Sequence, residues 1–344
     1  ASEMLGVGPV KTFFKLMLPM ARPAIIAGLI LVLMEVLNDY GAAKYFGVNT
    51  FTTGIFRSWF SLEEPETAVY LSALLIVIVF SLILLEKFQR RKLRFNSNRD
   101  NNMRLNRKQL SSKMQFVILL VVLLPVLLGF LLPVAQLIYW ATLTYENVFN
   151  LYFLTISVQS FGIALLTAFV SVIIAVILIF FSKWSRLGFI KNIAKLGILG
   201  YAIPGAVVAI GIMIPTIFID RWLIDIMDYL FNVDMGLILT GTLVALIYAY
   251  VVRFLAVAYN PIESTALKVS NAIPDSSNML GVGNLRTFFK IEFPLIRTGI
   301  ASAFILVFVD VLKELPLTLI LKPFHVNTLA VKAYEYASDE MVME

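Results

Sequence analysis

The fold is decided by the stretch Ser276-Ser277-Asn278-Met279-Leu280-Gly281-Val282-Gly283, because a near copy, Ala1-Ser2-Glu3-Met4-Leu5-Gly6-Val7-Gly8, opens the chain. The copies pair at a constant offset of 275 positions, which brings together Met4 and Met279, Gly6 and Gly281, Pro19 and Pro294, and Arg22 and Arg297. The pairing continues without a gap into the apolar run that follows each loop. A match of this length indicates two copies of one unit, each a polar loop that leads into a hydrophobic helix.

The composition is that of a polytopic membrane protein. Hydrophobic residues make up 60% of the chain and charged residues 15%, with a mean hydropathy of +0.87, which soluble globular chains do not reach. There is no cysteine and a single histidine, His325, so disulfides, thiolate chemistry and multi-histidine metal centres are excluded. No Gly-x-x-x-x-Gly-Lys-Ser/Thr loop is present, so we expect no nucleotide bound in that way. No catalytic site and no metal site are predicted.

Seven apolar runs predict membrane spans, since about 20 helical residues cross the hydrocarbon core of a bilayer. They cover residues 23–38, 68–85, 115–140, 155–181, 194–218, 237–258 and 298–315. The fifth run is rich in glycine and contains Pro204 and Pro215. Small residues allow close helix packing in lipid and prolines permit kinks, so we expect this span inside the bundle.

Charged residues predict the orientation of the loops. Residues 86–114 carry ten Lys or Arg against two acids, and basic loops favour the cytoplasmic side. Counting spans then places the basic loop 182–195 inside, the aspartate-rich loop 219–236 outside and both glycine loops inside. Six spans separate the two glycine loops, so the repeats are parallel. Binding of lipid headgroups by the basic stretch is a weaker interpretation of the same charges, and no nucleic-acid partner is expected.

The chain is therefore divided into three parts. Residues 1–85 are predicted to be the C-terminal part of a first half, with one glycine loop and two spans. Residues 86–114 are predicted to be a basic cytoplasmic linker. Residues 115–344 are predicted to be a second half with five spans and a glycine loop at 275–294. Comparison of the halves predicts three or four further spans before Ala1 and one after Glu344, so that the chain is a fragment of a longer protein.

Two pairs of acids occur at matching places in the repeated spans. Glu35 and Asp39 lie four residues apart on one helix face, and Asp310 and Glu314 take the same places in the second copy. A carboxylate there costs about 2.5 kcal/mol or more unless it faces water or the bundle interior. One hypothesis is that both pairs line a translocation pathway and attract a cation. The other is that Asp39 and Glu314 mark helix ends and that Lys313 neutralises one of them.

One further charge lies within an apolar run. Arg253 is expected to extend toward the membrane surface or to pair with a carboxylate, rather than to bind a substrate.

The glycine loops resemble the EAA loop of ABC-importer membrane subunits, in which a small pair is followed by Gly, by Leu or Ile ten residues later, and by Pro three further on. Asp275 replaces the usual leading Glu in the second loop, and that position would precede Ala1 in the first. The resemblance implies a short cytoplasmic helix that docks on an ATP-binding subunit, with a glycine turn suited to positive φ. The coupling residues that it implies are Ala1, Ser2, Leu5, Gly6, Gly8, Pro19, Asp275, Ser276, Ser277, Leu280, Gly281, Gly283 and Pro294. The alternative is an ordinary interfacial loop that its phenylalanines anchor in the headgroups.

Longer stretches across the whole chain resemble permeases that are fused as two halves and serve iron(III)-binding-protein-dependent importers. Examples are Met34-Glu35-Val36-Leu37-Asn38-Asp39-Tyr40-Gly41, Arg253-Phe254-Leu255-Ala256-Val257 and Lys313-Glu314-Leu315-Pro316. The resemblance implies an all-α, type I ABC-importer fold in a bacterial inner membrane.

The same resemblance implies the partners, which are two copies of an ABC ATP-binding subunit and a periplasmic solute-binding protein. ATP and Mg²⁺ would be bound and hydrolysed in the partner subunit, and no cofactor is expected in this chain. Iron(III) prefers oxygen ligands, with which the lack of cysteine is compatible. The alternatives are a fused permease for another solute such as thiamine, and a secondary transporter driven by an ion gradient, which inverted repeats would favour.

Overall fold

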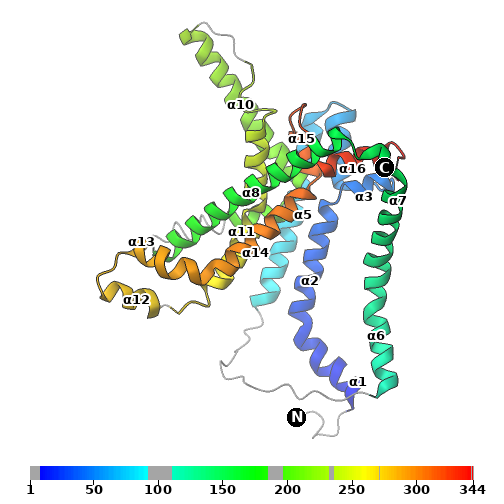
Figure 1. Ribbon diagram of the computed structural model, residues 1–344, viewed down its shortest axis with the longest axis vertical. Helices are drawn as coiled ribbons and strands as arrows, with labels where there is room; N and C mark the ends of the chain where they lie inside the picture. Colours follow the sequence, from blue (N-terminus) through cyan, green and yellow to red (C-terminus); the bar gives the residue numbers. More distant parts are fainter. Residues whose placement is uncertain are drawn as a thin grey trace.

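The computed structural model describes residues 8–91, 111–184, 197–231, 236–270 and 272–341 together with residue 343, and these residues are mostly helical (Figure 1). The helical elements, in chain order, are α1 (Pro9–Thr12), η1 (Phe13–Met17), α2 (Leu18–Asn38), α3 (Gly41–Tyr45), α4 (Phe51–Phe56), η2 (Arg57–Ser61), α5 (Pro65–Arg91), α6 (Ser112–Val126), η3 (Leu127–Leu131), α7 (Leu132–Val148), α8 (Leu151–Trp184), η4 (Ile198–Ala202), α10 (Gly205–Phe231), α11 (Leu243–Ala266), α12 (Ala272–Met279), α13 (Asn284–Thr287), η5 (Phe288–Glu292), α14 (Phe293–Leu312), α15 (Pro316–Leu321) and α16 (Leu329–Ser338).

The structure agrees with the predicted number of spans, although not with all of their bounds. Within the described residues, six helices are long and apolar enough to cross a membrane, and there are seven if a bent pair is one span. The six cover Pro65–Leu85, Ser112–Glu146, Leu151–Lys183, Gly205–Phe231, Leu243–Ala266 and Asn284–Leu312. The bent pair joins Val10–Arg22 to Ala24–Asn38 at an angle of 60°. The bend falls at Pro23, which has no backbone N–H to donate to the helix.

The two copies of the repeat have the same local structure. Each glycine loop leads into a turn of π-helix, η1 or η5, at the same place in the copy. The Thr12 hydroxyl donates to the Gly8 carbonyl at 3.2 Å, and the Thr287 hydroxyl donates to the Gly283 carbonyl at 3.3 Å. Helices α2 and α14 then rise from the loops toward α3, α15 and α16 (Figure 1). The repeats are therefore parallel, with a loop side and a far side.

The repeat also extends beyond its gapless part. Val48-Asn49-Thr50 precedes α4, and Val326-Asn327-Thr328 precedes α16. The Thr50 hydroxyl accepts from the Thr53 N–H at 3.2 Å, and the Thr328 hydroxyl accepts from the Val331 N–H at 3.4 Å. Both threonines thus cap the start of a far-side helix.

The predicted fifth span is broken rather than kinked. Helix η4 ends at Ala202, Ile203 is extended with φ −85° and ψ 130°, and α10 begins at Gly205 after Pro204. Proline disfavours a helical conformation in the residue before it, so the break falls at this dipeptide. The first turns of α10, from Gly205 to Ile210, are buried in the bundle. The rest of α10 rises away from it (Figure 1).

One loop boundary was predicted wrongly. The aspartates expected in an outer loop at 219–236 lie mainly on α10, which continues to Phe231. Asp220 is buried there. Its carboxylate accepts from the backbone N–H groups of Ile238, Leu239 and Thr240 at 2.7–3.2 Å, and these bonds offset the cost of burying it. The linker predicted at 86–114 is helical at both ends, in α5 and α6. Its residues 92–110 lie outside the described part of the chain, as do residues 185–195 of the basic loop.

The core of the bundle is formed by α8, α11 and α14, which pack side by side. Glycine allows two close approaches to α11. A Cβ on Gly200 would overlap the Val252 carbonyl, and a Cβ on Gly299 would lie 2.8 Å from the Pro261 carbonyl oxygen. The helix α6–α7 stands apart, with none of its membrane-spanning window buried in the described chain (Figure 1). This arrangement leaves the ends of α2 and α14 beside the break in the fifth span.

Candidate functional site

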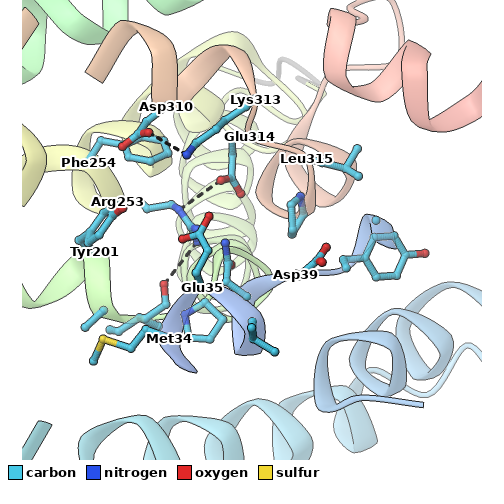
Figure 2. A pocket seen from close by; sticks show the side chains of 18 residues that line it. Met34, Glu35, Asp39, Tyr201, Arg253, Phe254, Asp310, Lys313, Glu314 and Leu315 are labelled. Carbon is cyan, nitrogen blue, oxygen red and sulfur yellow. Dashed lines mark hydrogen bonds and ion pairs between the residues drawn. The ribbon is translucent and has the colours of Figure 1, made fainter. Parts of the chain in front are cut away.

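A cavity of about 470 Å³ lies where the broken span meets the ends of α2 and α14 (Figure 2). All four acids of the predicted pathway line this cavity, namely Glu35, Asp39, Asp310 and Glu314. The structure thus brings the matching acids of the two repeats into one space. Their role in translocation stays a prediction.

Arg253 projects into this cavity from the middle of α11. Its Nε lies 3.4 Å from Oε2 of Glu314, and both side chains are about 95% buried. Its Nη1 donates to the Ile203 carbonyl at 3.3 Å. Of the two expectations for Arg253, pairing with a carboxylate is the one that the structure shows. Since α11 continues to Ala266, eight residues past the predicted end of the span at 258, this pair is deep in the bundle.

The break in the fifth span frees backbone groups, and side chains from other helices satisfy them. Arg253 satisfies the Ile203 carbonyl, and Oδ1 of Asn38 accepts from the Gly205 N–H at 2.8 Å. Asn38 is the last residue of α2, so the first repeat caps the start of a helix in the second part of the chain. In membrane proteins, irregular backbone is tolerated where it is buried in protein or lines a cavity. This break does both.

Gly205 allows the charged pair to approach the backbone. A Cβ at this position would overlap Oε1 of Glu314 and would lie 2.5 Å from Nη1 of Arg253. Both atoms belong to side chains that are held by other bonds. A side chain at this position therefore has to displace a buried ion pair.

We accordingly expect Gly205→Ala to destabilise the folded protein by about 1–3 kcal/mol, the usual cost of overpacking. The measurement is the thermal or denaturant-induced unfolding of the purified protein in detergent. Gly211→Ala is the matched control, because it lies on the same helix with no atom within 4 Å of the added Cβ. Equal stability of the two variants would show that the Arg253–Glu314 pair does not need the space at Gly205.

The acids differ in how their charges are balanced. Lys313 lies 3.1 Å from Oδ1 of Asp310, so it neutralises this acid and not Asp39 or Glu314 as the alternative hypothesis proposed. Glu314 faces Arg253. Among the described residues, no cation lies within 4 Å of Glu35 or Asp39. With four acids and two cations on the wall, the cavity has an excess of two negative charges, and these lie on the first repeat (Figure 2).

Two of the acids also mark helix ends, as the alternative hypothesis proposed. Oδ1 of Asp39 accepts from the Ala42 N–H at 3.2 Å, at the start of α3. Oε1 of Glu314 accepts from the Leu317 N–H at 3.1 Å, at the start of α15. Each acid therefore combines a structural bond with a position on the cavity wall.

The described part of the chain contains no group of three or more Asp, Glu or His side chains that could hold a metal ion together.

The backbone of the second glycine loop is described throughout residues 275–294. Helix α12 is fixed to α13 by a hydrogen bond of 2.7 Å between the hydroxyls of Ser277 and Thr287. Gly281 has φ +75°, so the expected positive φ is found. Leu280 is 82% exposed, and its role in docking stays a prediction. Asp275, Ser276 and Gly283 are also exposed, and Pro294 is the second residue of α14.

The first glycine loop is described only from Gly8 onward. Gly8 precedes α1 and Pro19 is the second residue of α2. The candidate residues Ala1, Ser2, Leu5 and Gly6 lie outside the described part of the chain.

Sequence reasoning missed three residues that organise these sites. Asn38 and Gly205 meet across 167 positions, and only their proximity to an acid and to Pro204 could have indicated them. Glu292 is buried in η5 and lies 2.6 Å from Nζ of Lys183 at the end of α8. An acid between Ile291 and Phe293 was the available signal for this second pair.

Comparison with known proteins agrees with this architecture. Residues 1–94 match the family described as "Binding-protein-dependent transport system inner membrane component". The chain is 29% identical over 343 residues to the "Fe(3+)-transport system permease protein FbpB 2" of Haemophilus influenzae, an alignment that covers 98% of this chain and 64% of the relative. It is 31% identical over 88 residues to the "Probable transport system permease protein NifC" of Clostridium pasteurianum, which covers 24% of this chain and 31% of that relative.

These findings confirm the predicted resemblance to permeases of binding-protein-dependent systems and the predicted fold class. The chain is an all-α, multi-pass membrane protein with two parallel repeats. It spans less than two thirds of the length of the first relative.

Proposed function

We propose that this chain forms the transmembrane pathway of a binding-protein-dependent ABC importer in a bacterial inner membrane, and that its solute is iron(III). The observation that carries the proposal is the cavity at the break of the fifth span, where acids from both repeats face each other. In secondary transporters, solute sites lie at repeat interfaces beside discontinuous helices, and we apply the same reasoning to this cavity. The relative from Haemophilus influenzae, whose name is that of an Fe(3+)-transport permease, supports the choice of solute.

The charges of the cavity support a cation as the solute. Two carboxylates, Glu35 and Asp39, have no partner cation in the described residues. Iron(III) is a hard ion that binds oxygen ligands, and the cavity offers carboxylate and hydroxyl oxygens. A weakly chelating wall would let the ion pass after its release from a periplasmic binding protein.

The glycine loops support docking of an ATP-binding subunit. In the second loop, Met279 and Leu280 are largely exposed next to the turn at Gly281. The loop is stiffened by the Ser277–Thr287 bond and connects through η5 to α14. We assign two copies of the ATP-binding subunit, one to each loop, and place ATP, Mg²⁺ and hydrolysis there. The chain itself then needs neither a catalytic site nor a cofactor.

The test is uptake by the full-length protein reconstituted in liposomes with its ATP-binding subunit. Iron(III) on a periplasmic binding protein is supplied outside, and ATP with Mg²⁺ is supplied inside. We expect iron uptake that requires both. Uptake of another solute such as thiamine under the same conditions would overturn the choice of iron. Uptake driven by an ion gradient without ATP would overturn the ABC assignment.

Removal of charge from the cavity is expected to lower uptake. Combining Glu35→Gln with Asp310→Asn should reduce the rate about tenfold or more, since each acid contributes to the attraction of the cation, while binding of the ATP-binding subunit is retained. Of the two single variants, Glu35→Gln should lower uptake more than Asp310→Asn, because Lys313 already neutralises Asp310. Asp225→Asn, an exposed acid on α10 outside the cavity, is the control. Unchanged uptake in the double variant would remove both acids from the pathway.

A further inference from the structure

The segment Asn38-Asp39-Tyr40-Gly41, here called the clasp, joins the first part of the chain to the second. Oδ1 of Asn38 accepts from the Gly205 N–H at 2.8 Å. The hydroxyl of Tyr40 lies 3.1 Å from the hydroxyl of Tyr334 on α16. Cδ2 of Leu315 lies 3.2 Å from the position that a Cβ on Gly41 would take. Three of the four residues in the clasp therefore contact partners that are far along the chain.

The clasp is held in place from its own side. Tyr40 is buried and stacks on Phe56 with ring centroids 3.8 Å apart and planes at 23°. The Asp39 carbonyl accepts from the hydroxyl of Thr52 at 3.0 Å. Because α4 supports the clasp through these contacts, we expect the clasp to move together with the first repeat.

The clasp lies between two cavities. Gly41, Lys313 and Leu315 line the cavity with the four acids, and the same three residues line a second cavity of about 500 Å³. The second cavity lies on the far side, between α3, the end of α14 and α16, and Tyr334 is part of its wall. The contact of Leu315 with Gly41 is thus a partition between the two spaces.

We propose that the clasp is the far-side gate of the pathway, closed in this structure and opened when Asn38, Tyr40 and Gly41 separate from Gly205, Tyr334 and Leu315. This inference rests on the proposed function for its direction, because a solute arriving from the periplasm would enter by the second cavity. The bonds suit a gate. They are two hydrogen bonds between uncharged groups and one apolar contact. Loss of one such hydrogen bond shifts the equilibrium between the closed and the open gate by about twofold to tenfold. An ion pair buried at this place would be much harder to separate.

The first experiment locks the gate. The chain has no cysteine of its own, so Tyr40→Cys with Tyr334→Cys introduces one pair, which a bis-maleimide can bridge in the reconstituted transporter. We expect the unbridged pair to import solute and the bridged pair to lose at least nine tenths of that rate. Import by the bridged protein at the unbridged rate would show that these residues need not separate, and would overturn the gate.

The second experiment does not depend on the solute or on transport. Ala202→Cys places a thiol on the wall of the acidic cavity, and a membrane-impermeant maleimide is added from the far side. Asn38→Ala and Tyr40→Phe should each raise the labelling rate about twofold to tenfold, as expected for loss of one hydrogen bond. Tyr70→Phe, which removes an exposed phenol from α5 outside both cavities, is the matched control and should leave the rate unchanged.

The two experiments separate the gate from the proposed function. Labelling that rises with Asn38→Ala and Tyr40→Phe supports the gate even if iron(III) is not transported. Equal labelling of all variants overturns the gate even if iron(III) uptake is established.

Discussion

Arg253→Met should destabilise the folded protein by about 3–5 kcal/mol, because it leaves Glu314 as a buried carboxylate without its partner. The pair is about 95% buried on both sides, and the substitution also removes the bond from Arg253 to the Ile203 carbonyl at the break. The measurement is unfolding of the purified protein in detergent, together with the amount of folded protein recovered from membranes.

The second variant of this test carries Glu314→Gln in addition. Glutamine has no charge and keeps an acceptor for the Leu317 N–H that Glu314 binds. The double variant should therefore regain most of the stability that Arg253→Met loses. A double variant that is less stable than the single one would show that the two side chains do not act as a pair.

Gly281→Val should lower solute uptake at least tenfold without preventing membrane insertion. Gly281 has φ +75°, where a β-branched residue is strained by roughly 1–3 kcal/mol. The turn would change its angle or crowd the docked subunit, so that ATP hydrolysis is lost or no longer drives uptake. Gly6→Val should act in the same way on the first loop. The measurements are ATP hydrolysis and uptake by the reconstituted full-length complex.

Gly283→Ala is the matched comparison for this prediction, because it changes another predicted coupling residue of the same loop without straining the backbone. Gly283 lies two residues further along, with φ −65° and no atom within 4 Å of an added Cβ. Alanine fits that conformation, so hydrolysis and uptake should stay close to normal. Normal values in the Gly6→Val and Gly281→Val double variant would mean that the loops are only connectors.

The sequence predicted the repeat, the spans and the acids because each is a local pattern. The offset between Met4 and Met279 is visible without a structure, and so are two acids spaced four apart in an apolar run. The number of spans and their parallel arrangement follow from these patterns. Pro204 likewise indicated a disturbance of the fifth span.

The partners of these residues could not be predicted, because they are set by packing between distant helices. Arg253 meets the Ile203 carbonyl 50 positions away, and Asn38 meets Gly205 167 positions away. Asp220 misled the loop prediction for the same reason. An aspartate normally indicates a loop, but three backbone N–H groups satisfy this one, and the helix continues past it.

The repeats differ in charge at one pair of equivalent positions on the cavity wall. Asn38 of the first copy corresponds to Lys313 of the second. A dimer of identical subunits would have to place the same residue at both positions. Two lysines would leave the start of α10 without its cap and remove part of the negative excess. Two asparagines would leave Asp310 without a counter-charge. A single polypeptide that carries both copies is free of this symmetry. The first copy can therefore cap the start of α10 with Asn38, while the second balances the charge of Asp310 with Lys313.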